Sequence, residues 1–278
     1  MEEVNCDICG IDKTKNIVSS DKFNIVQCQG CGLVYMNPRP DKRWLSEYYV
    51  NYYLDLKGHY EEERLYKCRF KERLDAIEKF KDKGRLLDIG CGVGFFLQLA
   101  KERKWQVSGI EFSPLSADIA RASGVDVLTG SIEDADLESG SFDVITMWHV
   151  IEHLQRPSEA LKKIYCALKK GGVLALETPN MDYYFKFKAD KLNDVLRPEH
   201  LYNFSSRTLA RLLENSGFTV LNLEQRPSGT DLGGVLKKYR VKGYLVKHLP
   251  FLSVIREPLM RFRGLLGQNE VIVAYAKK

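Results

Sequence analysis

Short apolar runs alternate with helical patterns from Arg85 to about Leu223. Runs bounded by glycine or polar turns predict strands over 86–90, 107–111, 125–130, 142–148, 173–179, 218–224 and, near the end of the chain, 271–276. Apolar positions at helical spacing predict helices over 95–103, 114–123, 158–172 and 205–217. This alternation predicts an α/β fold, with a parallel sheet covered by helices on both faces.

The same pattern divides the chain into three parts. Residues 1–40 are rich in turns and hold two cysteine pairs. Residues 41–83 are predicted to be a helical segment that links the other two parts or covers a bound cofactor. Residues 84–278 form the main domain, in which we expect a substrate lid over 181–205 and a basic amphipathic insertion over 231–268.

Composition and charge narrow the class of protein. Hydrophobic residues make up 44% of the 278 positions and charged residues 28%, which is typical of a globular protein. No apolar run approaches the roughly 18 residues of a membrane span, and the first residues lack a signal-peptide pattern, so we expect a cytoplasmic protein. The net charge is +5, but residues 231–268 hold eight lysines and arginines against two acidic residues. The sequence therefore does not predict a general nucleic-acid-binding surface.

A glycine-rich turn follows the first predicted strand of the main domain. Gly90, Gly92 and Gly94 lie in Asp88-Ile-Gly-Cys-Gly-Val-Gly, directly before a predicted helix. Glycine lets the backbone approach a ligand closely, and a helix N-terminus favours a negative group. Glu111 ends the next predicted strand, where a carboxylate can accept hydrogen bonds from both hydroxyls of a ribose.

The spacing of this turn distinguishes between two nucleoside cofactors. It is Gly-x-Gly-x-Gly, which departs from the dinucleotide pattern Gly-x-Gly-x-x-Gly. The carboxylate of Asp88 would repel a pyrophosphate, but it could hold the amino group of a zwitterionic ligand. The pattern therefore favours S-adenosylmethionine over NAD.

Six sequence blocks in this order resemble the class I S-adenosylmethionine-dependent methyltransferases of the ubiquinone-methyltransferase-like branch. They are LLDIGCGVG (86–94), GIE (109–111), GSIEDADLESGSFDVI (130–145), HVIEHLQRP (149–157), LKKGGVLALETPN (168–180) and HLYNFSSRTLARLLENSGF (200–218). The resemblance covers about residues 84–228. It implies a Rossmann-like sheet of seven strands, with the last strand antiparallel.

The resemblance also implies a cofactor site. The glycine turn lies against the methionine part, Glu111 takes the ribose, and the segment after the third strand flanks the adenine. Many relatives carry aspartate in that segment, whereas this chain has Ser131, followed by Ile132 and Glu133. The candidate cofactor-binding residues are Asp88, Gly90, Cys91, Gly92, Gly94, Glu111, Phe112, Ser131, Ile132, Glu133, Trp148 and His149.

Three histidines are candidates for chemistry on the methyl acceptor: His149, His153 and His200. Histidine is the natural proton acceptor near neutral pH. Structural roles stay open: His200 could cap the following helix, and Glu152 and His153 could brace the helix after them. The motif His-x-x-Glu-His at 149–153 matches a zinc-peptidase pattern, but it begins at the end of a predicted strand, so we do not expect a metallopeptidase.

Two Cys-x-x-Cys pairs predict a metal site near the start of the chain. Cys6 and Cys9 are separated from Cys28 and Cys31 by a spacing typical of tetrahedral zinc. Four thiolates leave no open position, so the zinc would be structural, in a small ribbon or knuckle. A redox role would need a βαβ context, which the pattern lacks. The stretch CGLVYMNPRPD (31–41) resembles a zinc-bearing N-terminus of bacterial methyltransferases, several of them linked to surface polysaccharides.

Two further segments allow more than one interpretation. Tyr48, Tyr49, Tyr52 and Tyr53 either pack a helix onto the main domain or cover the cofactor. Residues 231–268 interleave cations with apolar residues, which fits a helical subdomain on the core. It also fits an amphipathic element that contacts an anionic membrane or a phosphate-bearing substrate.

Together these features predict an S-adenosylmethionine-dependent methyltransferase with a structural Zn²⁺. We expect a small-molecule acceptor, sugar- or phosphate-bearing, methylated on a hydroxyl of a sugar or of a cell-surface polysaccharide intermediate. Two alternatives stay open: an RNA methyltransferase that grips its substrate with the zinc module and the basic insertion, and a non-catalytic S-adenosylmethionine-binding protein. Nucleic acid is not the expected partner, because the basic and aromatic residues do not form a recognisable RNA-binding module.

Overall fold

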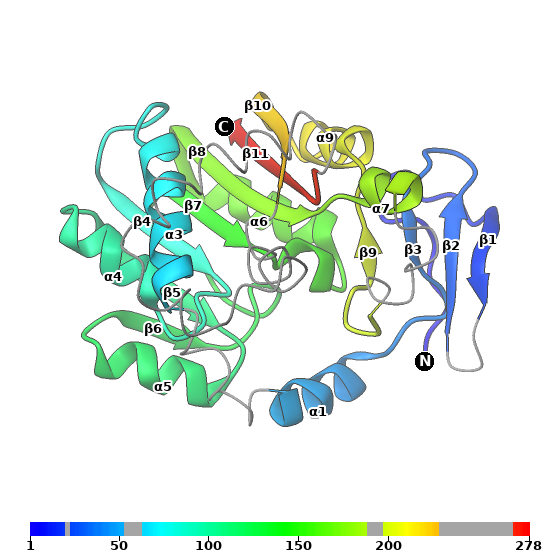
Figure 1. Cartoon of the computed structure of the whole chain (residues 1–278), viewed down its shortest axis with the longest axis horizontal. Helices are drawn as coiled ribbons and strands as arrows, with labels where there is room; N and C mark the ends of the chain where they lie inside the picture. Colours follow the sequence, from blue (N-terminus) through cyan, green and yellow to red (C-terminus); the bar gives the residue numbers. More distant parts are fainter. Residues whose placement is uncertain (20–22, 53–62, 188–196, 228–268) are drawn as a thin grey trace, which may run out of the picture.

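A twisted sheet of seven strands forms the centre of the computed structural model, which describes residues 1–19, 23–52, 63–187, 197–227 and 269–278 (Figure 1). The basic insertion at 231–268 lies outside these residues. The strand order is β10-β11-β8-β7-β4-β5-β6. The strands are β4 (Arg85–Ile89), β5 (Gln106–Glu111), β6 (Asp126–Thr129), β7 (Phe142–Trp148), β8 (Leu168–Pro179), β10 (Thr219–Arg226) and β11 (Val271–Lys277).

Strand direction follows the expectation. Strands β4 to β8 pair in parallel, whereas β11 lies antiparallel between β8 and β10. The predicted seven-stranded sheet with an antiparallel last strand is therefore confirmed. Because parallel strands have their carboxyl ends at one edge, the loops after β4, β5 and β7 converge there.

Helices cover both faces of the sheet, as the alternation predicted. Neighbouring residues in a strand point to opposite faces, and Leu86 and Leu87 accordingly belong to different buried clusters. One cluster contains residues from α3 (Glu63–Ile77), α4 (Phe95–Glu102) and α5 (Pro114–Ala122). The other contains residues from α6 (Pro157–Ala167) and α9 (Ser206–Asn215).

One predicted boundary is wrong. The sequence pattern predicted a helix over 158–172, but α6 ends at Ala167 and β8 begins at Leu168. Leu168 has an extended backbone and pairs with Phe142 of β7, while Lys169 forms an ion pair with Asp143 at 2.6 Å. Pairing with a strand distant in sequence thus overrides the helical pattern of these residues.

The N-terminal part forms a second, small sheet that the main domain completes. Its order is β1-β2-β3-β9, with β1 (Thr14–Ser19), β2 (Asn24–Cys28), β3 (Val34–Met36) and β9 (Tyr202–Asn203). Figure 1 shows β9 reaching from the main domain to the edge of this sheet. Leu33 and Tyr35 share one buried cluster with Phe204 and Leu209, so the N-terminal part and the main domain share a core.

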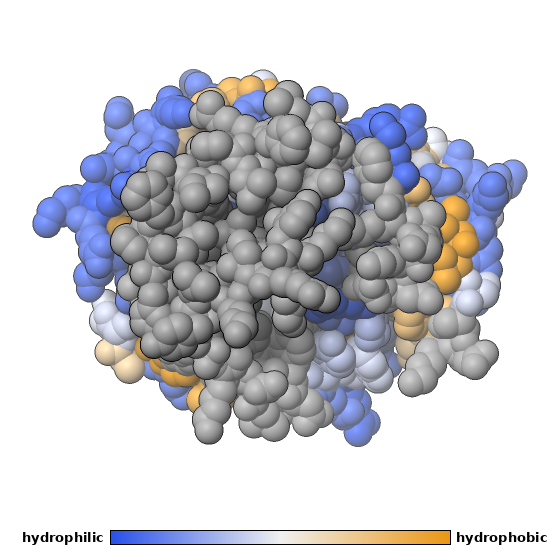
Figure 2. Space-filling model, viewed as in Figure 1, coloured by the Kyte–Doolittle hydropathy of each residue, from blue (hydrophilic) through white to orange (hydrophobic). Residues whose placement is uncertain are grey.

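Three short helices complete the described fold: α1 (Lys42–Tyr52), the 3₁₀ helix η2 (Ile151–His153) and α7 (Met181–Phe187). Helices α1 and α3 agree with the helical prediction for 41–83. No helix in the described ranges is long and apolar enough to cross a membrane. On the face shown in Figure 2, the coloured residues are mostly hydrophilic, and the apolar ones form small separate patches.

Candidate functional site

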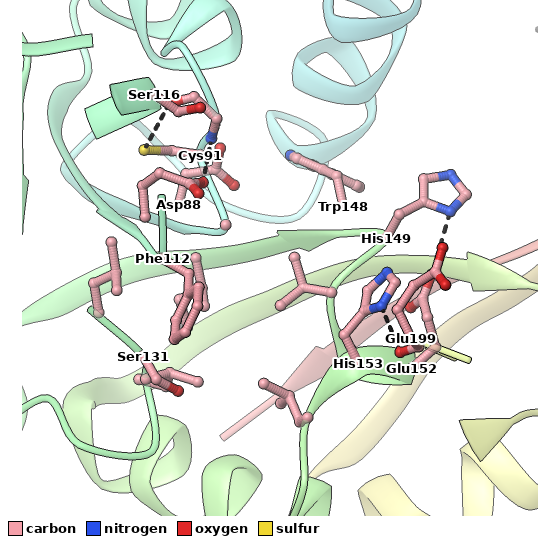
Figure 3. A pocket seen from close by; sticks show the side chains of 18 of the residues that line it. Asp88, Cys91, Phe112, Ser116, Ser131, Trp148, His149, Glu152, His153 and Glu199 are labelled. Atoms are coloured by element: carbon pink, nitrogen blue, oxygen red, sulfur yellow. Dashed lines mark hydrogen bonds and ion pairs between the residues drawn. The ribbon is translucent and has the colours of Figure 1, made fainter. Parts of the chain in front are cut away.

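A cavity of about 590 Å³ opens at the carboxyl ends of β4, β5 and β7. Every predicted cofactor-binding residue except Gly94 lines it, and so do the three predicted histidines. Figure 3 shows two sides: Asp88, Cys91, Phe112 and Ser131 lie opposite His149, Glu152, His153 and Glu199. We call the first side the cofactor half and the second the acceptor half.

Gly94, a candidate cofactor-binding residue from the sequence, is not among the residues that line the cavity. It precedes α4 with a φ of +85°, a left-handed conformation that favours glycine. A Cβ added there would lie 3.0 Å from the Cβ of Ala120 on α5. The turn and the close contact between α4 and α5 thus explain this glycine without a ligand.

Glu111 joins the glycine turn to the end of β5. Its carboxylate accepts hydrogen bonds of 2.8 Å from the backbone N–H groups of Gly92 and Ser113. Burial raises the pKa of Glu111, and these N–H groups oppose that shift. Each oxygen keeps a lone pair, so the carboxylate can still accept two hydroxyl hydrogen bonds from a ribose.

Asp88 is a buried carboxylate at the end of β4, with 1% of its surface exposed. It accepts a hydrogen bond of 2.6 Å from the hydroxyl of Thr146 on β7. Burial, with a smaller contribution from Glu111, raises the pKa of Asp88 to about 7. A bound ammonium group would favour the ionised carboxylate, which fits the amino group of S-adenosylmethionine.

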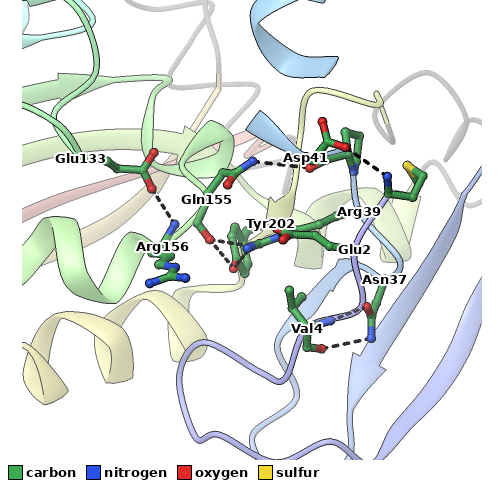
Figure 4. A network of polar contacts seen from close by, with 11 residues as sticks. Glu2, Val4, Asn37, Arg39, Asp41, Glu133, Gln155, Arg156 and Tyr202 are labelled. Atoms are coloured by element: carbon green, nitrogen blue, oxygen red, sulfur yellow. Dashed lines mark hydrogen bonds and ion pairs between the residues drawn. The ribbon is translucent and has the colours of Figure 1, made fainter. Parts of the chain in front are cut away.

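The segment after β6, residues 131–135, is held by hydrogen bonds within itself and to Arg156 and Lys163. Ser131 accepts one from the N–H of Glu133, and Glu133 accepts one of 2.7 Å from the N–H of Arg156 (Figure 4). Lys163 of α6 donates three, of 2.8–3.1 Å, to backbone carbonyls in 132–135. The carboxylate of Glu133 therefore braces the loop, while the loop itself lines the cavity.

An arginine pair that the sequence analysis missed lies between the two halves. Arg73 of α3 is buried, forms an ion pair of 2.8 Å with Glu177, and lies 4.3 Å from the ring of Trp148. Arg69, one helical turn earlier, also pairs with Glu177. The sequence feature that could have predicted this contact is Glu177 in the apolar run VLALETP, because a buried charge needs a partner.

His149 is bound into the same ion network. Its Nε2 lies 2.9 Å from Glu177 Oε1 and 2.8 Å from Arg69 Nη2. Its backbone has a φ of +57°. Burial and the nearby arginines lower the pKa of His149. Its ring therefore takes part in a structural ion network at the border of the two halves.

His153 and His200 meet in the acceptor half, with ring centroids 4.8 Å apart. The Nδ1 of His153 lies 2.8 Å from the carbonyl oxygen of Glu199, which can only accept. Nδ1 therefore carries the hydrogen and Nε2 carries the lone pair. Burial and the adjacent His153 lower the pKa of His200 to about 3, so its ring is neutral.

Two buried atoms in the acceptor half have no hydrogen-bond partner among the described residues, Glu199 Oε2 and His200 Nδ1, whereas Glu152 Oε1 lies 3.4 Å from His149 Nδ1. The other oxygen of Glu152 accepts from the hydroxyl of Thr178 at 2.9 Å. Although burial opposes ionisation, the hydrogen bond with His149 and the nearby His153 lower the pKa of Glu152 to about 2. The acceptor half therefore offers an ionised carboxylate with spare acceptor capacity.

The structure also decides two questions about these histidines. Ser205, whose hydroxyl accepts from the N–H of Thr208, caps α9, so the capping role considered for His200 is wrong. Glu152, His153 and His200 have ligand atoms within 4.8 Å of one another and could hold a metal ion, but His149 is not in this group. The two histidines of the peptidase-like motif thus line one cavity but do not belong to one candidate metal-ligand group.

Of the four clustered tyrosines, Tyr48 lines the cavity beside Lys42 and Leu45 from the same face of α1. The side chains of Tyr49 and Tyr52, and all of Tyr53, lie outside the described residues. Helix α1 thus contributes to the cavity wall.

Residues 60–223 match the sequence model of the family described as "Methyltransferase domain", which covers more than half of the chain. The chain belongs to this family. The predicted resemblance to class I S-adenosylmethionine-dependent methyltransferases is thereby confirmed.

Two curated relatives illustrate the similarity. A probable S-adenosylmethionine-dependent methyltransferase of Mycolicibacterium smegmatis is 29% identical over 137 residues, which are 49% of this chain and 52% of the relative. A ubiquinone biosynthesis O-methyltransferase of Idiomarina loihiensis is 36% identical over 118 residues, which are 39% of this chain and 49% of the relative. The chain thus spans about half the length of these relatives.

Solved structures share the fold. An S-adenosylmethionine-dependent methyltransferase of Archaeoglobus fulgidus has a TM-score of 0.57 at 24% identity, covering 82% of this chain and 99% of that chain. A possible histamine N-methyltransferase of Thermotoga maritima has a TM-score of 0.57 at 23% identity, covering 81% and 96%. Both likenesses support the Rossmann-like assignment of the sheet.

The four N-terminal cysteines form a second candidate site, away from the cavity. Their Sγ atoms lie within 4.8 Å of one another, with 3.4 Å between Cys6 and Cys31 and between Cys9 and Cys28. Tetrahedral zinc with bonds of about 2.3 Å would place its sulfurs about 3.8 Å apart. The thiolate set and its spacing therefore fit the predicted structural Zn²⁺.

We expect the purified protein to contain about one zinc per chain, and Cys28→Ser to lose it. Because the metal would stabilise a sheet that shares a core with the main domain, this variant should also melt several degrees lower. Metal analysis and thermal melts check both effects, with the exposed Cys166→Ser as the control. Wild-type protein that folds and melts identically with and without zinc would refute the metal site.

Asp88→Asn should stabilise the ligand-free protein at high pH. The pKa of Asp88 in the folded protein, about 7, exceeds its ordinary value of 3.8. The folded state therefore loses stability as pH rises from about 4 to 7. The amide removes this cost, so the melting temperature should exceed that of wild type by about 2–8 °C at pH 8 and by less at pH 5.

Thermal melts across this pH range, with the exposed Asp118→Asn as the control, measure the difference. An offset that stays constant with pH would mean that Asp88 does not carry the cost.

Proposed function

We propose that the protein is an S-adenosylmethionine-dependent methyltransferase acting on a hydroxyl of a small molecule, such as a sugar or a cell-surface polysaccharide intermediate. One observation carries the proposal: a single cavity joins a glycine turn and Glu111 to a group of buried hydrogen-bond acceptors. Membership of the methyltransferase-domain family supports the cofactor half. The chemistry of the acceptor half supports the hydroxyl.

Two carboxylates would orient the cofactor. Glu111 would accept hydrogen bonds from the ribose hydroxyls, since its own hydrogen bonds occupy one lone pair on each oxygen. Asp88 would pair with the amino group, and Thr146 fixes its carboxylate for that contact. The loop 131–133 would flank the adenine, because it lines the same half of the cavity.

The unpartnered atoms of the acceptor half indicate the class of acceptor. A buried acceptor without a hydrogen bond costs about 1–3 kcal/mol, and a ligand that donates hydrogen bonds would recover this. Glu199 Oε2 belongs to a carboxyl group, and the ring of His200 is neutral. Several hydroxyl groups on one acceptor, as in a sugar, would supply the donors.

The bound cofactor would supply an electrophilic methyl group to the acceptor oxygen. His153 is our candidate for the group that takes the hydroxyl proton, because its Nδ1–H bond to Glu199 leaves the lone pair on Nε2. The adjacent carboxylate of Glu152 would stabilise the imidazolium that results. Alignment of the acceptor oxygen with the methyl group supplies much of the remaining acceleration.

Glu111→Gln should weaken S-adenosylhomocysteine binding roughly tenfold to a hundredfold, since hydrogen bonds to charged groups contribute most to such sites. Calorimetric titration measures this, with the exposed Glu138→Gln as the matched control. If wild-type protein with a native melting curve shows no binding, the methyltransferase proposal fails and a role without this cofactor takes its place.

His153→Gln should reduce methyl transfer by roughly 10²- to 10⁴-fold with little change in S-adenosylhomocysteine affinity, because the ring lies in the acceptor half. The assay measures release of S-adenosylhomocysteine with panels of sugars, sugar phosphates, phenols and amines. Turnover of amines alone would contradict the hydroxyl acceptor. Full activity of the variant on a true acceptor would contradict the role of His153.

A further inference from the structure

Arg39 is the one arginine in the sequence of residues 1–40, and its side chain is buried against the main domain, with 5% of the residue exposed. Its Nη1 donates to the carbonyl oxygen of Gln155 and, at 2.8 Å, to the hydroxyl of Tyr202. The Tyr202 hydroxyl in turn donates to the same carbonyl at 2.9 Å. Glu2 pairs with the Nε of Arg39 at 2.8 Å, which completes the network in Figure 4.

The two main-domain partners of Arg39 come from the two segments that form the acceptor half. Gln155 lies two residues after His153, and Tyr202 lies two residues after His200. Arg39 therefore joins these segments behind the histidine pair, while His153 Nδ1 and the Glu199 carbonyl join them at the cavity. A single guanidinium suits this task, because its planar donors can serve several acceptors at fixed angles.

Backbone pairing reinforces the same connection. Strand β3 pairs with β9 through Val34 with Asn203 and Tyr35 with Tyr202, and the N–H of Met36 donates to the carbonyl of Leu201. β3 begins three residues after Cys31, whose carbonyl accepts a hydrogen bond from Arg207. The cysteine-bearing part is thus bound directly to the segment that carries Glu199 and His200.

We propose that Arg39 is a positioning residue for the acceptor half: it fixes the His153–His200 pair by holding Gln155 and Tyr202 together. The N-terminal part thereby supports the acceptor half from outside the cavity, whose lining residues begin at Lys42. Arg39 itself does not line the cavity. The role of the two rings toward a methyl acceptor rests on the proposed function, whereas their positioning by Arg39 does not.

The first test measures the histidine rings directly. In protein labelled with ¹⁵N-histidine, wild-type His153 should show the tautomer with hydrogen on Nδ1, as its bond to the Glu199 carbonyl requires. Arg39→Met keeps the aliphatic stem but removes the guanidinium, and it should give a mixture of tautomers. Tyr202→Phe removes one hydroxyl without changing the ring, and it should shift the spectrum in the same direction by less.

The second test measures amide hydrogen exchange in full-length protein. Arg39→Met should raise exchange about tenfold or more in peptides covering 152–156 and 197–204, because hydrogen bonds to a charged group are lost there. Exchange in β4 and affinity for S-adenosylhomocysteine should stay within about threefold of wild type. The matched control is Arg43→Met, because the side chain of Arg43 is 88% exposed.

The outcomes separate the two proposals. An unchanged His153 tautomer in both variants, or exchange that rises equally in β4, would overturn the positioning role of Arg39. Absence of S-adenosylhomocysteine binding in wild type would instead overturn the proposed function and leave the ring measurement valid. Once an acceptor is known, Arg39→Met should raise its KM at least tenfold while the S-adenosylhomocysteine Kd is retained.

Discussion

Burial of carboxylates near the carboxyl ends of parallel strands is the constraint on which the site depends. Asp88 lies near the end of β4, Glu111 ends β5 and Glu177 lies near the end of β8, and each is at most 4% exposed. A buried carboxylate is stable only with partners, and each of these has a different kind. Asp88 has a hydroxyl, Glu111 has two backbone N–H groups, and Glu177 has two arginines. These partners place the glycine turn, β7 and α3 around one cavity.

The arginine pair also explains how α3 belongs to the site. Arg69 and Arg73 lie one turn apart, so both reach Glu177 from the same face of the helix. Arg73 then lies over Trp148, which places a cation on the aromatic wall between the two halves. The packing of a helix outside the glycine-turn motif thus determines the border between the two halves of the cavity.

The N-terminal part contacts the segments that form the acceptor half, without lining the cavity itself. Its sheet ends on β9, its apolar residues join the core under α9, and Arg39 contacts the loops behind His153 and His200. The cysteine module is therefore structurally part of the site, although its four thiols lie away from the cavity lining. This arrangement gives a physical reason for the cysteine-bearing module in a methyltransferase-family chain: its strand β3 pairs with β9, which the main sheet does not contain.

The sequence by itself determined the features that depend on local patterns. Strand–helix alternation predicted the central sheet, Gly90 and Gly92 marked the turn, and cysteine spacing marked the candidate metal site. Tertiary structure decided the features that join distant residues. The β8 boundary at Leu168 follows from pairing with β7, and the links from Glu177 to Arg73 and from Arg39 to Tyr202 span 104 and 163 positions. Local propensity carries no information about such pairs, because their energy arises only when folding brings buried charges and unpaired strand edges together.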